Sequence, residues 1–170
     1  MDGLQYAFRH NSWATRRLIE ACRDLTPEQL EATTPGAVGG VRETLKHIID
    51  TEGHRLRMLL TGTSPSWERR RDESPDLDTL AARAEENERF WIDYLGTAVD
   101  AERPVRVGYE GKTWDVTAGP ILAQVVHHGS AHREQVCTIL TVLGVEPPDL
   151  SGWAYAGANG HIVKASPAAP

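Results

Sequence analysis

Apolar residues recur at intervals of three or four positions along four long stretches of the chain, with charged residues between them. This spacing is typical of amphipathic helices that bury one face. The helices are expected at about Asp2 to Cys22, Val41 to Leu60, Asp76 to Ala98 and Pro120 to Leu143. Before the last of them the apolar period changes to alternation on either side of Glu110-Gly111-Lys112, which predicts a small β-hairpin. The pattern therefore predicts an all-α fold, a four-helix up-and-down bundle with a small β-hairpin insertion before the last long helix.

Short local signals mark where these elements begin and end. Asp2 is expected to cap the first helix, and Thr26 followed by Pro27 is expected to start a short helical turn. The inner face of the first helix is expected to carry Leu4, Phe8, Asn11, Leu18 and Cys22. From Ser151 onward the chain is rich in glycine, alanine and proline. We therefore expect one bundle domain over residues 1–150 and an irregular C-terminal tail over residues 151–170.

The composition is that of one ordinary globular domain. The 170 residues are 40% hydrophobic and 25% charged, which argues against a disordered or a membrane-spanning chain. The formal net charge is −6, and the arginines between Glu68 and Asp72 are flanked by acids, so we interpret this run as a solvated loop and expect no nucleic-acid partner. Cys22 and Cys137 have no partner nearby in sequence, which suits a reducing compartment. With no export signal or membrane segment, the protein is expected to be cytoplasmic.

Two histidines interrupt the apolar stripe of the last long helix. The stripe runs Ile121, Val125, then positions 128 and 132, then Val136, Ile139 and Leu143. His128 and His132 are four residues apart, so they lie above one another on one helix face and can direct ring nitrogens to a single point. Buried imidazoles must be hydrogen-bonded or coordinated, at a cost of about 1–3 kcal/mol per unsatisfied group. The pair therefore predicts two metal ligands, whereas His127 points about 100° away and is expected at the surface.

Three motifs resemble those of the DinB family, whose members are four-helix-bundle metalloenzymes that include thiol-dependent S-transferases. The motifs are His10 to Leu18 in the first helix, Val41 to Ile48 in the second and His128 to Gln135 in the fourth. The hairpin segment Gly111 to Trp114 also lies where the family has one. The resemblance extends over nearly the whole chain to about Pro148. Singly the motifs are weak, but their order and spacing together are specific.

The resemblance implies a divalent metal ion held by His47, His128 and His132, and a homodimer. The family often has a histidine where this chain has Ala131 and a glycine where it has Glu134, and neither difference removes a ligand. Periodicity alone places His47 about 150° from the apolar stripe of its helix, on the exposed side. The two interpretations agree if the helix is covered on two sides, the second by a partner subunit.

Other residues near the second helix leave alternatives open. His54 lies seven residues after His47, on the same helix face, and competes with it as the third ligand. Glu52 lies within the apolar stripe, where it could orient a ligand, accept a hydrogen bond from Asn11 or reach solvent. Arg133 could extend to solvent or pair with an acid instead of binding a substrate.

Three imidazoles bind Zn²⁺, Ni²⁺ or Fe²⁺ and leave a coordination position open. The ion could activate water for hydrolysis or bind a low-molecular-weight thiol as thiolate for attack on a small electrophile, and the resemblance favours thiol transfer. We expect a metal-dependent transferase with a small-molecule substrate and a thiol co-substrate. A metal-dependent hydrolase, a stress-associated bundle that binds metal without turnover and a purely structural bundle acting through its dimer surface remain the alternatives. The sequence identifies no catalytic acid, base or nucleophile and no thiol-binding residues.

Overall fold

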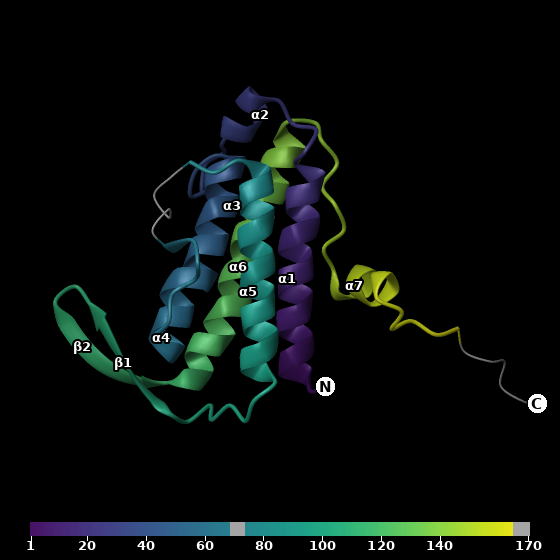
Figure 1. Ribbon diagram of the computed structural model, residues 1–170. Coiled ribbons are helices and arrows are strands. Elements are labelled where there is room, and N and C mark those ends of the chain that lie inside the picture. Colours follow the sequence, from purple (N-terminus) through teal and green to yellow (C-terminus); the bar gives the residue numbers. More distant parts are fainter. Residues whose placement is uncertain (69–73, 165–170) are drawn as a thin grey trace, which may run out of the picture.

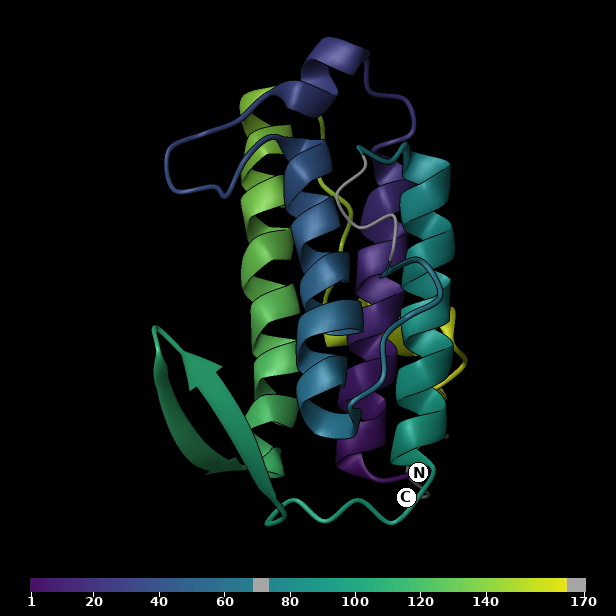
Figure 2. The same ribbon diagram turned by 60° about the vertical axis from the view of Figure 1, so that its left-hand side comes forward.

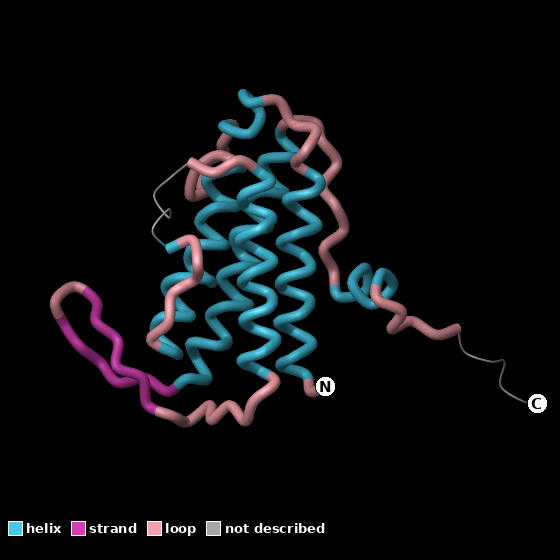
Figure 3. The backbone as a smooth tube through the Cα atoms, in the orientation of Figure 1, coloured by secondary structure: helices cyan, strands magenta, loops and turns pink. Residues whose placement is uncertain are grey.

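The computed structural model describes residues 1–68 and 74–164, and these are mostly helical with one small antiparallel hairpin, as the sequence predicted (Figures 1 and 3). The long helices are α1 (Gly3–Ala21), α3 (Val41–Asp50), α5 (Leu77–Leu95) and α6 (Ala118–Val142). The shorter helical elements are α2 (Pro27–Glu31), the π-helix η1 (Thr51–Leu56), α4 (Arg57–Thr61) and α7 (Gly152–Ala158). Asp2 and Thr26 cap α1 and α2 with capping boxes, as predicted. The arginine run at 69–71 lies outside the described residues, so the loop interpretation stays a prediction.

The long helices lie side by side, with α1 and α3 each packed against both α5 and α6 (Figures 1 and 2). The expected simple up-and-down order is wrong, because α3 and α5 run in the same direction. The end of α1 and the beginnings of α3 and α5 share one apolar cluster with the end of α6. The long connection between Thr61 and Leu77 gives the chain enough length to return before α5 begins. The directions are therefore up, down, down and up.

The core consists of two apolar clusters with polar side chains between them. One cluster contains Leu18, Leu45, Leu80 and Val136, and the other contains Phe8, Leu56, Trp91 and Val125. Between these levels each long helical segment contributes a buried polar residue, which we call the polar layer: Asn11, Glu52, Asn87 and Arg133, all at most 4% exposed. Buried polar groups need hydrogen-bond partners, so this layer constrains how the helices pack. Leu4, expected on the inner face, is instead 39% exposed because the first turn of α1 lies at the end of the molecule (Figure 1).

The second predicted helix spans the expected length but is not a uniform α-helix. Its middle, Thr51–Leu56, is a π-helix. A Cβ atom on Gly53 would lie 2.1 Å from Asn87 Oδ1, and Asn87 Nδ2 donates to the Ile49 carbonyl at 2.9 Å. The inserted amide occupies space next to the helix backbone and hydrogen-bonds to it, which is a recognised cause of local widening.

The hairpin extends away from the helices (Figures 1 and 2). Strands β1 (Pro104–Tyr109) and β2 (Lys112–Thr117) pair antiparallel, with Val107 opposite Trp114. Val105 is buried in the apolar cluster that contains Phe8, whereas Trp114 is 45% exposed. The base of the hairpin thus anchors it to the core at the start of α6.

The irregular tail expected from Ser151 is wrong for Gly152–Ala158, which form α7. Ser151 caps this helix by accepting from the Ala154 amide, and Tyr155 is buried against His10 and Trp13 of α1. The cap and one buried aromatic residue stabilise α7. This helix is too short to show an apolar stripe in the sequence. Residues 165–170 of the predicted tail lie outside the described residues. Among the described residues, no helix combines the length and apolar character needed to span a bilayer.

Candidate metal centre

Three histidines meet between α3 and α6, and we call them the histidine cluster: His47, His128 and His132. One ring nitrogen of each residue can be chosen so that all three lie within 4.8 Å of one another. The ring centroids are 4.9 Å apart for His47 and His128, and 4.4 Å apart for His128 and His132. The four-residue spacing on α6 places two of the rings next to each other, edge to face, and α3 presents the third opposite them. The three residues predicted from the sequence are thus brought together.

His47 is half-buried because α6 of the same chain covers its side of α3. Thr44, one turn earlier on that side, is completely buried. The exposed position that periodicity indicated is therefore wrong, and so is the need for a partner subunit to cover it. His127, in contrast, is exposed as expected.

The environment of the histidine cluster favours neutral imidazoles. Burial lowers the pKa of His128 to about 4, with further lowering by the charges of His132, His47 and Arg55. Burial also lowers the pKa of His47, followed by the effect of His132 and then Arg55. A neutral imidazole retains a lone pair on one ring nitrogen, which is the form that binds a metal ion.

Gln135 orients the ring of His132. Its Nε2 donates to the Gly36 carbonyl at 2.9 Å, which directs its Oε1 toward His132 Nδ1 at 2.8 Å. Because this oxygen can only accept, Nδ1 of His132 donates and carries the proton. The lone pair of His132 is then on Nε2. Metal-ligating histidines commonly donate their second nitrogen in this way, to a carboxylate or a carbonyl oxygen. Gln135 belongs to the motif from His128 to Gln135, but its role in orienting His132 was not predicted. Its three-residue spacing from His132 could have indicated this role.

The donor set fits a divalent metal ion. The Nε2 atoms of His47 and His128 lie 3.0 Å apart, close to the roughly 3.3 Å expected for two nitrogens about 2.0–2.1 Å from a tetrahedral ion. His128 Nδ1 is buried without a hydrogen-bond partner among the described residues.

His54 does not join the histidine cluster. Its Nδ1 forms an ion pair with Glu68, which turns the ring toward the segment after α4. A residue of a π-helix turns the chain by about 85°, against about 100° in an α-helix, so residues beyond Thr51 fall progressively behind α-helical positions. The ring nitrogens of His54 are accordingly not among those that meet in the histidine cluster. Between the two candidates for the third ligand, the geometry favours His47.

The polar layer adjoins the histidine cluster along α6, where Gly129 follows His128 and Arg133 follows His132. Arg133 Nη1 donates to Asn11 Oδ1 at 2.8 Å and to Thr15 Oγ1 at 3.0 Å, and Asn11 Nδ2 donates to Glu52 Oε1 at 3.1 Å. Burial raises the pKa of Glu52 to about 7, against the opposing effects of Arg133 and the Asn11 hydrogen bond. Of the alternatives for Glu52, the hydrogen bond from Asn11 is thus confirmed. Arg133 is buried as well, and it binds α1 instead of extending to solvent.

The family model of DinB matches residues 2–162. The chain belongs to the DinB family. No curated protein matches the chain. The resemblance found in the sequence motifs is therefore confirmed, and the match continues through α7. In this DinB protein, the three histidines that the resemblance led us to expect as ligands meet between α3 and α6.

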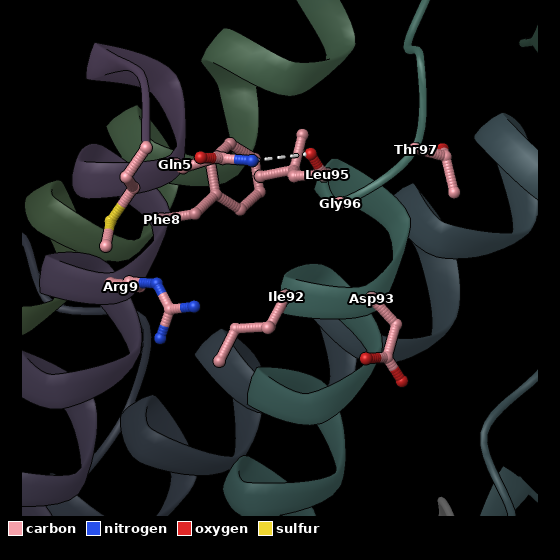
Figure 4. A pocket seen from close by; sticks show the side chains of 9 residues that line it. Gln5, Phe8, Arg9, Ile92, Asp93, Leu95, Gly96 and Thr97 are labelled. Carbon is pink, nitrogen blue, oxygen red and sulfur yellow. Dashed lines mark hydrogen bonds between the residues drawn. The ribbon is translucent and has the colours of Figure 1, made fainter.

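A pocket of about 280 Å³ opens beside the histidine cluster, and we call it the cluster pocket. It is lined by His47, Asp50, Thr51, His54 and Arg55. A larger pocket of about 470 Å³ lies between the start of α1 and the end of α5 (Figure 4). Arg9 and Ile92 face its space from the two helices, and Gln5 Nε2 donates to the Leu95 carbonyl at 2.9 Å. None of the residues that line this larger pocket belongs to the histidine cluster, so the cluster pocket is the better candidate for a substrate.

The remaining histidines of the first helix and the tail have structural contacts. His10 Nε2 lies 2.8 Å from the Leu150 carbonyl and donates to it. The ring of His161 packs edge-on to Tyr6, with centroids 5.3 Å apart. Both residues hold the segment around α7 against α1.

Proposed function

We propose that this DinB protein is a divalent-metal-dependent enzyme, most simply a thiol-dependent S-transferase acting on a small electrophile. The observation that carries the proposal is the convergence of three imidazoles, one of them oriented by Gln135, beside a pocket of about 280 Å³. Family membership supports it, because the resemblance includes thiol-dependent S-transferases.

In this proposal His47, His128 and His132 are the metal ligands, and the ion is Zn²⁺, Ni²⁺ or Fe²⁺. Three protein ligands leave room for an exchangeable one. When bound, the ion would supply a Lewis acid that lowers the pKa of a thiol or of water. His132 is held by Gln135 with its proton on Nδ1, so its Nε2 stays available to the site. The cluster pocket would hold the electrophile next to His47.

We further propose that α1, the segment from α3 to α4, α5 and α6 form a four-helix bundle domain within residues 1–150, and that the protein is a cytoplasmic homodimer. The packing of α1 and α3 against both α5 and α6 supports the bundle. Free Cys22 and Cys137 are consistent with a reducing compartment. Light scattering of the purified protein tests the dimer, and a monomeric mass would contradict it.

The function is tested by elemental analysis of the purified, untagged protein, followed by a screen of small electrophiles with candidate thiols. We expect about one metal ion per chain, thiol-dependent turnover, and loss of both in His132→Ala. His54→Ala is the matched control, because His54 pairs with Glu68, and it should keep its metal.

Each alternative has its own result in this experiment. Turnover of the same electrophiles without thiol would assign a hydrolase. Bound metal without any turnover would assign a non-catalytic metal-binding protein. Unchanged metal content in His132→Ala would contradict the ligand set, and no metal in the wild-type protein would leave a structural bundle.

A further inference from the structure

A cationic side chain borders the cluster pocket. Arg55 lines this pocket together with His47 and Thr51, and it is exposed. Its charge is among the causes that lower the pKa of both His47 and His128, after burial and the charge of His132. The charge of Arg55 therefore acts on two rings of the histidine cluster.

The π-helix places Arg55 on this side of the chain. In an uninterrupted α-helix, Arg55 would point about 80° away from the direction of His47. With about 85° per residue from Thr51 onward, it points within about 20° of that direction. The π-helix beside the inserted amide of Asn87 thus brings Arg55 to the side of the chain that carries His47.

No acidic side chain neutralises Arg55 within residues 1–68 and 74–164. It has no ion pair or hydrogen-bonded partner there, in contrast to Arg57, which pairs with Glu86. The one carboxylate lining the cluster pocket, Asp50, lies 2.9 Å from Lys46 Nζ and 3.7 Å from Arg83 Nη1. Two cations therefore share the charge of Asp50, and it is not available to balance Arg55.

The charge balance of the proposed metal site points in the same direction. Neutral imidazoles leave both positive charges of a divalent ion uncompensated, and Arg55 adds a third nearby. An anionic ligand between the ion and the guanidinium would reduce this repulsion, and guanidinium groups bind carboxylates and phosphates through paired, charge-assisted hydrogen bonds.

We propose that Arg55 is a specificity-determining residue that binds an oxyanion group of the substrate, so that the substrate of the histidine cluster is a small anion. Thr51 lines the same pocket, and in this proposal its hydroxyl donates a second hydrogen bond to the oxyanion. The volume of about 280 Å³ is at the lower end of ligand pockets and suits a small molecule. This inference rests on the proposed function.

The test measures anion binding separately from turnover. Acetate, inorganic phosphate and the neutral acetamide are titrated into the purified protein and into the same protein after metal removal with EDTA. The readout is the NMR shift of the backbone amides of Thr51 and His54, which line the pocket and are present in every variant. We expect acetate or phosphate to bind in both preparations and acetamide not to bind. In metal-free protein, Arg55→Gln should weaken anion binding about tenfold or more, and Arg55→Lys by less. Arg89→Gln, an exposed arginine of α5 outside the pocket, is the matched control and should bind like the wild type.

The outcomes separate the inference from the proposed function. If Arg55→Gln loses acetate binding, the substrate is assigned as a carboxylate. If Arg55→Gln loses only phosphate binding, the substrate is assigned as a phosphorylated compound. Equal affinities in wild type and Arg55→Gln overturn the inference, even if metal content and turnover are as proposed. Once a substrate is known, Arg55→Gln should raise KM for the anionic compound and leave a neutral analogue unchanged, and an equal effect on both would also overturn it.

Discussion

Nε2 of His47 and Nε2 of His128 lie 3.0 Å apart, although the two residues are 81 positions apart in the sequence. If they share a metal ion with His132, the ion binds the folded state and not the unfolded chain. Zinc at 100 times its dissociation constant should then stabilise the protein by about 2.7 kcal/mol. For a chain of this size that corresponds to a rise in melting temperature of about 5–10 °C. Thermal unfolding with and without zinc measures it, and the same rise in His128→Ala would contradict the shared site.

Replacing Gln135 should weaken metal binding without removing a ligand. Gln135→Ala deletes the acceptor that holds His132 Nδ1, so the ring is free to rotate and to shift its proton. We expect a 10- to 100-fold weaker metal affinity, the usual effect of losing such a partner. Competition with a chromophoric chelator measures it. Gln124→Ala, at an exposed position of the same helix, is the matched control, and equal affinities in the two variants would disprove the role of Gln135.

Gly129 allows α6 to approach the polar layer closely. A Cβ atom there would lie 2.5 Å from Asn11 Oδ1 and 2.6 Å from Glu52 Oε1. Gly129→Ala should therefore lower the free energy of unfolding by about 2–3 kcal/mol through overpacking, as measured by urea denaturation. Gly119→Ala is the control in the same helix, because its Cβ would meet only ordinary contacts at 3.4 Å and 3.6 Å. Similar stability of the two variants would mean that the layer adapts without cost.

The buried carboxyl of Glu52 should make stability depend on pH. Burial raises the pKa of Glu52 from 4.5 to about 7. Between these two pH values the carboxyl is protonated in the folded protein and ionised in the unfolded chain. Its contribution is complete below pH 4.5 and is lost as the pH rises through 7. The difference in unfolding free energy between wild type and Glu52→Gln should therefore fall over this interval. Denaturant titrations of the metal-free proteins at a series of pH values test this, and parallel pH profiles would refute it.

The helices, the hairpin and two of the three histidines could be predicted from the sequence because each leaves a local pattern. His128 and His132 interrupt an apolar stripe, which is visible within a single helix. His47 could not be found in this way, since its burial depends on α6, which is distant in the sequence. Only the family resemblance indicated it.

Features set by tertiary contacts were missed for the same reason. The π-helix accompanies an amide inserted from α5, and nothing in the sequence around Gly53 names Asn87 as its neighbour. The parallel directions of α3 and α5 depend on a long connection, and the sequence of this connection has no apolar periodicity from which they could be predicted. The helix α7 is too short for an amphipathic pattern, and it is stabilised by the burial of Tyr155.

The polar layer also determines how the helices are aligned along their length. If the helices packed only through apolar stripes, one helix could shift by a turn along its neighbour, because each aliphatic contact would be replaced by a similar one. In this protein such a slide would place the guanidinium of Arg133 against aliphatic side chains and leave Asn11 and Glu52 without partners. That penalty selects a single axial position for α6 relative to α1 and α3. His128 and His132 precede Gly129 and Arg133 on α6. If α6 took any other axial position, these two histidines would not face His47.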